Sequence, residues 1–116
     1  MKKKAIQDMK YKTHNDRIPF KSICSQGYLQ GYIEASYWEL KDLFGQPMDR
    51  EDNKVDVEWV INFEDGSYAT IYNYKNGKNY CGKNGIPTTK IRDWHIGGVD
   101  QKAIPNIEKL LKDIRE

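Results

Sequence analysis

Apolar side chains occupy every second position over nine residues in the middle of the chain. They are Val55, Val57, Trp59, Ile61 and Phe63. A period of two indicates a half-buried strand with this set on its core side. Asp65-Gly66 follows at once and favours a type I′ hairpin turn, which needs positive φ at both central residues. With a return strand at residues 68–74, the pattern predicts an antiparallel hairpin over about residues 54–75.

Two segments with a helical period flank this hairpin. Ser36 and Glu39 have the spacing of a capping box, and Gly45 stands where a left-handed residue ends a helix. We therefore expect a short amphipathic helix at about residues 36–45. A stripe of aliphatic residues near the end of the chain predicts a C-terminal helix at about residues 103–115.

The remaining segments are less regular. Residues 48–53 are highly charged, and we expect a loop there, whereas residues 18–23 fit a short edge strand. Residues 76–87 contain two Asn-Gly pairs and indicate a turn-rich excursion that would act as a mobile lid. The chain is then expected to return to an extended conformation at residues 91–96.

These elements predict an α+β fold, in which helices pack on one face of a small antiparallel sheet. A chain of 116 residues fits a single domain, residues 1–116. We expect residues 1–16 to be flexible, since chain ends are poorly ordered unless they are tied down. The composition, with 31% charged and 12% aromatic residues, is typical of a globular protein and not of a disordered one.

Charge and hydrophobicity narrow the functional class. The 19 basic and 17 acidic residues give a net charge of +2, which argues against an acidic mimic of nucleic acid. A nucleic-acid binder would need its basic residues clustered on one face, which the net charge does not establish. No run approaches the roughly 20 apolar residues of a membrane-spanning helix. No apolar segment follows the lysines at 2–4, as it would in a signal peptide, so we expect a cytoplasmic protein without membrane association.

Signals for catalysis and metal binding are weak. The histidines and cysteines lack the spacing of a zinc site. They are His14, His95, Cys24 and Cys81. Cys81 with His95 would make a weak Cys/His hydrolase, which ranks third among the functions considered because no orienting residue is evident. Asp56 and Glu58 alternate with core positions, and we interpret them as residues on the solvent-exposed face of a strand. We therefore expect no catalytic residue, metal or cofactor.

The segment from Tyr72 to Gly98 is the most function-like part of the chain. It supplies eight candidate ligand-binding residues, namely Tyr72, Tyr74, Lys75, Arg92, Trp94, His95, Gly97 and Gly98. Aromatic faces stack on bases, and lysine and arginine pair with phosphates. The double glycine precedes Asp100 and a helix, which fits either an anion-binding nest of backbone amides or a plain turn into that helix. For Trp94 and His95, core and contact roles both stay open.

Several short motifs resemble a family of small phage and prophage accessory proteins. They are Phe44-Gly45-x-Pro47, Asp65-Gly66, Ala69-Thr70-Ile71-Tyr72 and Trp94-His95-Ile96-Gly97-Gly98. The resemblance covers about residues 30–98. It implies a phage or mobile-element origin, and by analogy with such proteins it implies antagonism of host defence, by blocking a nuclease or by sequestering a nucleotide signal.

The sequence therefore favours a non-enzymatic binding protein that captures a small nucleotide-like ligand, with a homodimer or higher homo-oligomer left open. The alternative is an inhibitor that binds a host defence protein, such as a CRISPR effector, through an aromatic surface, because tyrosine and tryptophan dominate interface hot spots. A concave pocket lined by Tyr72, Arg92 and Trp94 would favour the ligand. A flat, exposed aromatic face would favour the protein partner.

Overall fold

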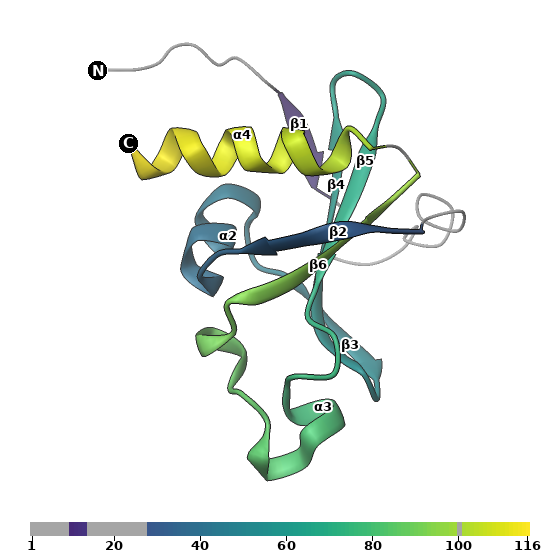
Figure 1. Ribbon diagram of the computed structural model, residues 1–116, viewed down its shortest axis with the longest axis vertical. Helices are drawn as coiled ribbons and strands as arrows, with labels where there is room; N and C mark the ends of the chain where they lie inside the picture. The colour runs from purple at the N-terminus through teal and green to yellow at the C-terminus, as the bar shows by residue number, and fades with distance from the viewer. Residues whose placement is uncertain (1–9, 14–27, 100) are drawn as a thin grey trace.

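The computed structural model describes residues 10–13, 28–99 and 101–116. Within these ranges it is an α+β fold with a six-stranded antiparallel sheet, as expected (Figure 1). The strands are β1 (Tyr11–Thr13), β2 (Tyr28–Glu34), β3 (Met48–Asp52), β4 (Val55–Phe63), β5 (Tyr68–Tyr72) and β6 (Asp93–Gly98). The helices are α2 (Tyr37–Phe44), the one-turn α3 (Lys78–Cys81) and α4 (Ala103–Arg115), with 3₁₀ turns η2 (Gly82–Asn84) and η3 (Thr88–Lys90). The strand expected at residues 18–23 lies outside the described residues.

The strands follow the order β1-β4-β5-β6-β2, and β3 pairs with the first part of β4. β4 and β5 form the predicted hairpin, with Trp59 opposite Ile71. β6 pairs with both β5 and β2, so β2 lies at an edge of the described sheet. β1 belongs to the N-terminal stretch that was expected to be flexible, and it pairs with the last residues of β4.

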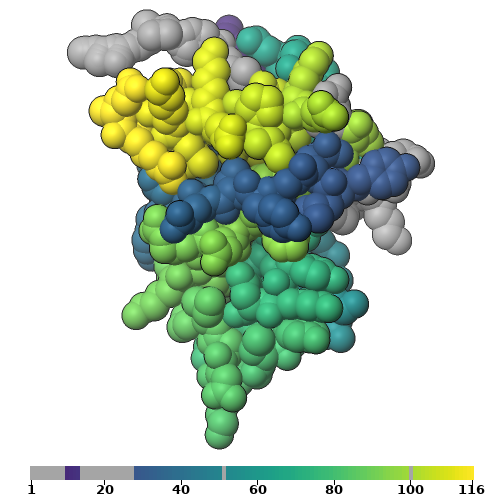
Figure 2. All heavy atoms as spheres, in the orientation of Figure 1, coloured from purple at the N-terminus to yellow at the C-terminus, as the bar shows by residue number. Residues whose placement is uncertain are grey.

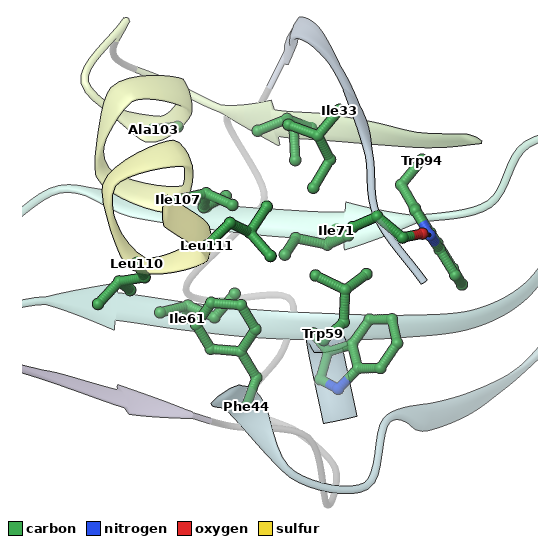
Figure 3. Close-up of a cluster of buried hydrophobic side chains, with 14 of the residues drawn as sticks. Ile33, Phe44, Trp59, Ile61, Ile71, Trp94, Ala103, Ile107, Leu110 and Leu111 are labelled. Carbon is green, nitrogen blue, oxygen red and sulfur yellow. Dashed lines mark hydrogen bonds between the residues drawn. The ribbon is translucent and has the colours of Figure 1, made fainter. Parts of the chain in front are cut away.

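One face of the sheet packs against α2 and α4 and forms the hydrophobic core (Figure 3). Trp59 and Ile61, from the alternating set of β4, have no exposed surface. Trp59 also contacts Trp94 of β6, with ring centroids 5.3 Å apart. The Trp59 indole N–H donates to the Gly45 carbonyl at 2.7 Å. The Trp94 indole N–H donates to the Ala35 carbonyl at 2.9 Å, so both buried indole donors have hydrogen-bond acceptors.

The two predicted helices are confirmed, and local signals explain their ends. At the start of α2, the Glu39 amide donates to Ser36 Oγ at 3.0 Å, and the Ser36 amide donates to Glu39 Oε1 at 2.9 Å. This is the reciprocal capping box. Gly45 ends the helix with φ of 84°, in the left-handed region that favours glycine. Across the described ranges, no helix combines the length and apolar character needed to span a membrane.

Residues 48–53 were expected to form a loop, but they contain strand β3. The backbone of β3 pairs with β4 from Met48 opposite Glu58 to Asp52 opposite Val55. The loop prediction was wrong because charge alone does not exclude a strand at the edge of a sheet, where charged side chains reach solvent. One of these charges, Arg50, turns instead toward the buried side chain of Glu58.

The turn between β4 and β5 also differs from the predicted type I′ geometry. Of its residues only Gly66 has a positive φ, at 90°. The Phe63 amide donates to the Ser67 carbonyl at 2.8 Å, which closes a three-residue loop with glycine in the left-handed position. The Asp65 carboxylate accepts hydrogen bonds from the Ser67 amide and hydroxyl at 2.9 and 2.5 Å. These bonds stabilise the longer loop over the two-residue turn.

Candidate functional site

The sheet face opposite α2 and α4, which we call the second face, carries a row of neighbouring polar and aromatic side chains. The row crosses four strands, from Tyr32 of β2 through His95 of β6 and Tyr72 of β5 to Glu58 of β4. Each residue is the direct cross-strand partner of the next. Because side chains alternate between the faces of a strand, the row lies opposite core residues such as Trp59.

His95 is the centre of an aromatic cluster at one end of this row. The centroid of its imidazole ring lies 4.8 Å from that of Tyr32, 5.5 Å from that of Tyr72 and 5.1 Å from that of Tyr74. Burial lowers the pKa of His95 and raises the pKa of Tyr72. The four members of the cluster can offer ring faces and edges for stacking. They are Tyr32, Tyr72, Tyr74 and His95.

A groove of about 230 Å³ lies beside the aromatic cluster. Its lining includes Tyr28, Arg50, Glu58, Thr70, Tyr72 and Gly97. Gly97 keeps the floor of the groove open, because a Cβ atom at this position would lie 2.6 Å from Thr70 Oγ1 and 3.5 Å from a Tyr72 ring carbon. The groove thus combines aromatic walls with a polar floor.

The polar floor is an ion pair between Arg50 of β3 and Glu58 of β4, in which Arg50 Nη1 donates to Glu58 Oε1. The Glu58 side chain is 6% exposed and that of Arg50 is 27% exposed. Burial raises the pKa of Glu58 to about 7, and its hydrogen bonds to Arg50 and Thr70 only partly offset this effect. Near neutral pH this carboxyl can act as a hydrogen-bond donor or as an acceptor.

The sequence pattern did not reveal the burial of Glu58, because it placed this residue on the solvent-exposed face of a strand. The signal for its burial is on the return strand, whose side chains on the second face are large or branched: Tyr68, Thr70 and Tyr72. Tyr72 lies directly opposite Glu58, and Thr70 hydrogen-bonds to it. A carboxyl that alternates with core residues is therefore covered when its cross-strand neighbours are bulky.

The predicted ligand-binding residues separate into two groups. Tyr72, Tyr74 and His95 meet in the aromatic cluster, and Gly97 lines the groove. Trp94 has no exposed surface and packs in the core, which resolves its open role in favour of the core. The exposed Arg92 forms an ion pair with Glu34 at 3.5 Å, and Lys75 Nζ lies 5.4 Å from the centroids of both Tyr74 and Tyr80. The eight predicted residues therefore do not all line one pocket. Tyr72, Gly97 and Gly98 line the groove, whereas Tyr74, Trp94 and His95 line a separate hollow.

The double glycine does not form the expected anion nest. Gly97 and Gly98 lie inside β6, where they pair with Leu29 and Tyr28 of β2. The next helix, α4, begins only at Ala103. The glycines are needed for close packing instead, since a Cβ atom at Gly98 would lie 2.8 Å from the Tyr68 carbonyl oxygen.

Asparagine side chains brace the excursion between β5 and β6. Asn79 Nδ2 donates to the carbonyls of Arg50, Asp52 and Val55 at 3.2, 3.0 and 2.9 Å. Asn73 Nδ2 donates to Asp56 Oδ1 at 2.8 Å, and the backbone N–H of Asn79 donates to Asp56 Oδ2 at 3.2 Å. These bonds fix the excursion to the β3–β4 hairpin, which argues against the expected mobile lid.

The Cys/His pair lacks the geometry of a nucleophile and its base. Cys81 Sγ is directed at the Lys75 carbonyl, 3.5 Å away, and within the described chain no hydrogen bond joins it to His95. His95 instead contacts tyrosine rings. The described residues also contain no group of three or more His, Cys, Asp or Glu side chains placed to hold a metal ion.

The second face offers an aromatic cluster beside a groove with a buried ion pair. All the residues of the cluster and of the groove belong to this one chain. The chain matches no protein-family model and no curated protein.

Proposed function

We propose that this protein captures a small nucleotide-like ligand on the second face of its sheet. The observation that carries the proposal is the juxtaposition of the aromatic cluster with a groove whose floor holds the Arg50–Glu58 pair. Stacking rings and a few convergent polar groups are the two components of a typical small-molecule site. The protein binds its ligand without transforming it.

The dimensions of the groove determine how such a ligand would lie. Small-molecule sites usually enclose roughly 300–1,000 Å³, and the groove is smaller, at about 230 Å³. It accommodates one base, whose edge would hydrogen-bond to Glu58 while its ring contacts Tyr28 and Tyr72. The rest of the ligand would lie over the exposed Tyr32 ring.

Arg50 is the cation that serves this ligand in place of Arg92 and Lys75. It lines the groove, and its side chain is partly exposed. The planar N–H donors of a guanidinium group match the geometry of phosphate oxygens as well as that of a carboxylate. Arg92 and Lys75 lie outside the groove lining, beside Glu34 and Tyr80 respectively.

The resemblance to phage accessory proteins supports the second part of the proposal, which is that ligand capture acts on host defence. A binding protein without a catalytic centre can act on host defence by removing a nucleotide signal from solution. We place this action in the cytoplasm of an infected bacterium. A homodimer or higher homo-oligomer would present several such grooves at once.

Isothermal titration with cyclic dinucleotides, ADP-ribose and cyclic ADP-ribose tests the proposal. Tyr72→Ala is expected to weaken the best ligand about tenfold, because stacking on one ring is worth about 1–3 kcal/mol per base. Tyr80→Ala is the matched control, since Tyr80 is exposed and lies outside the groove lining. Native mass spectrometry of protein purified from bacteria reports the oligomer and any retained ligand. The absence of heat with every nucleotide, together with the absence of a retained molecule, would contradict ligand capture.

A second candidate function, inhibition of a host defence protein such as a CRISPR effector, is favoured by β2. This edge strand exposes Tyr28, Leu29 and Tyr32 at 68%, 49% and 64%. Exposed tyrosines beside a strand edge that no other described strand pairs with suit a protein partner. In a pull-down from host cells, this function requires that the wild-type protein recovers a stoichiometric partner. The double variant Leu29→Ala/Tyr32→Ala should fail to recover that partner, whereas the control variant Tyr80→Ala should still recover it.

A further inference from the structure

The positive charge of this nearly neutral protein is concentrated in one segment. Residues 73–92 contain five of the 19 basic residues and none of the 17 acidic ones. The segment therefore carries +5, while the other residues, with 14 basic and 17 acidic side chains, carry −3. We infer that this segment, called the projection below, is a binding surface for the phosphate backbone of single-stranded nucleic acid, separate from the groove.

The lysines of the projection face solvent. Figure 2 shows the teal-to-green part of the chain narrowing at the lower end of the molecule, where Figure 1 places α3. Its exposed lysines are Lys75, Lys78, Lys83 and Lys90. Arg92 is balanced by its ion pair with Glu34, so the lysines provide the unneutralised charge. A cluster of this kind attracts a polyanion and releases its counterions on contact.

The acidic side chains described near these lysines contact other groups. The Asp56 carboxylate is directed inward and accepts hydrogen bonds from Asn73 and from the Asn79 amide. Asp52 contacts Arg50 and accepts from the Lys54 amide. Asp93 lies at the base of the projection, next in sequence to Arg92. The tip therefore keeps its positive potential.

The projection is preorganised for binding. Asn79 fixes it to three backbone carbonyls of the β3–β4 hairpin, and a β-bridge joins Gly77 to Ile86. Gly77 packs so closely that a Cβ atom there would lie 2.2 Å from Asp56 Oδ1. A surface already held in place loses little conformational freedom when a ligand binds.

Aromatic rings among the lysines favour a nucleic acid over an acidic protein. Tyr80 is 50% exposed, and Lys75 Nζ lies 5.4 Å from the centroid of its ring and from that of Tyr74. A base can stack on the open face of Tyr80 while the adjacent phosphate meets Lys75. Such alternation of stacking platforms and cations is characteristic of surfaces that bind single strands.

Fluorescence anisotropy with a labelled single-stranded oligonucleotide of about 20 nucleotides, titrated at several salt concentrations, tests this inference. Lys78→Glu/Lys83→Glu is expected to weaken binding at least tenfold. It should also reduce the slope of log K against log salt by roughly 1.4, since each phosphate contact on a single strand contributes about 0.7. The matched control is Lys109→Glu/Lys112→Glu, which changes two exposed lysines of α4 and alters the net charge equally. This control should bind within about twofold of the wild type.

Tyr80→Ala reports on stacking, and we expect about tenfold weaker binding, with Tyr80→Phe unchanged. Circular dichroism melting confirms that each variant is folded. The inference is overturned if the wild-type protein does not bind at low salt, or if both double variants weaken binding equally. It is also overturned if polyglutamate competes as well as unlabelled oligonucleotide, because that result would indicate an acidic protein as the partner.

Discussion

At the scale of single residues, Glu58 is subject to two opposing effects. Burial among the side chains of the second face disfavours its ionised form, whereas Arg50 and Thr70 favour that form. The effect of burial is the larger, and the pKa of Glu58 rises to about 7. A ligand edge that either donates or accepts a hydrogen bond can therefore be matched at neutral pH by a proton shift on one carboxyl.

Glu58 also predicts how stability changes with pH. Its pKa rises from 4.5 in the unfolded chain to about 7 on folding, so the folded protein holds a proton that the unfolded chain releases. The free energy of unfolding is therefore expected to fall as pH rises through this window, by up to about 3 kcal/mol. Glu58→Gln cannot ionise, so the variant should lose this pH dependence.

Urea denaturation of both proteins between about pH 5 and about pH 8 measures the effect. The stability of Glu58→Gln relative to the wild type should increase across the window and then stay level. Groups common to both proteins cancel in this difference. A difference that does not change with pH would show that Glu58 is ionised throughout.

At the scale of elements, the projection is shaped by amide hydrogen bonds rather than by a core of its own. The short helix α3 buries no side chain, and a helix of one turn is not stable in isolation. Its position depends on Asn79, which contacts the carbonyls of two neighbouring strands. A polar side chain thus performs the role that apolar packing has elsewhere in the molecule.

Asn79→Ala is expected to loosen the projection while leaving the sheet intact. The variant loses the side-chain bonds to three carbonyls, and we expect a cost of about 1–2 kcal/mol, since partly exposed carbonyls can bind water instead. Hydrogen exchange should show faster exchange at residues 77–86 than in the wild type. Asn84→Ala is the control, because the described contacts give the Asn84 side chain no hydrogen bond. Equal exchange in the two variants would rule out the bracing role.

The elements predicted correctly from the sequence are those with local signals. The capping box of α2 and the alternation of β4 depend on residues near one another in the chain, and each determines its element directly. The errors at β3 and Glu58 are connected, because a loop at residues 48–53 offers no partner for a buried carboxyl. Arg50 reaches Glu58 only through strand pairing, which local patterns do not reveal. The candidate site was therefore only partly predictable.

At the scale of the whole molecule, α4 joins distant parts of the fold at its last turn. Arg115 donates to both carboxylate oxygens of Glu39, at 2.7 and 2.9 Å, and to the Glu34 carbonyl at 3.0 Å. The hydrogen bond from Arg115, followed by that from the Ser36 amide, lowers the pKa of Glu39 to about 2. One side chain thus ties the C-terminal helix to β2 and α2.

Arg115→Ala is expected to lower the free energy of unfolding at neutral pH by about 1 kcal/mol, the upper end for a partly exposed pair with two-point geometry. Because the pKa of Glu39 is lowered from 4.5 to about 2, this contribution is present above pH 4.5 and is lost as pH falls toward 2. Chemical denaturation at neutral and acidic pH measures it. Lys112→Ala, an exposed residue of the same helix, should change stability little. A loss that persists at about pH 2 would mean that helix packing, and not the ion pair, is responsible.

The depth of the groove depends on the absence of a single carbon atom. With a methyl group at position 97, the Thr70 side chain would have to move, and the added carbon would occupy the floor. The lysines of the projection would stay as they are, because position 97 lies outside residues 73–92. Gly97→Ala therefore defines a separation-of-function allele, and introducing it into the gene would show which of the two surfaces matters in the cell.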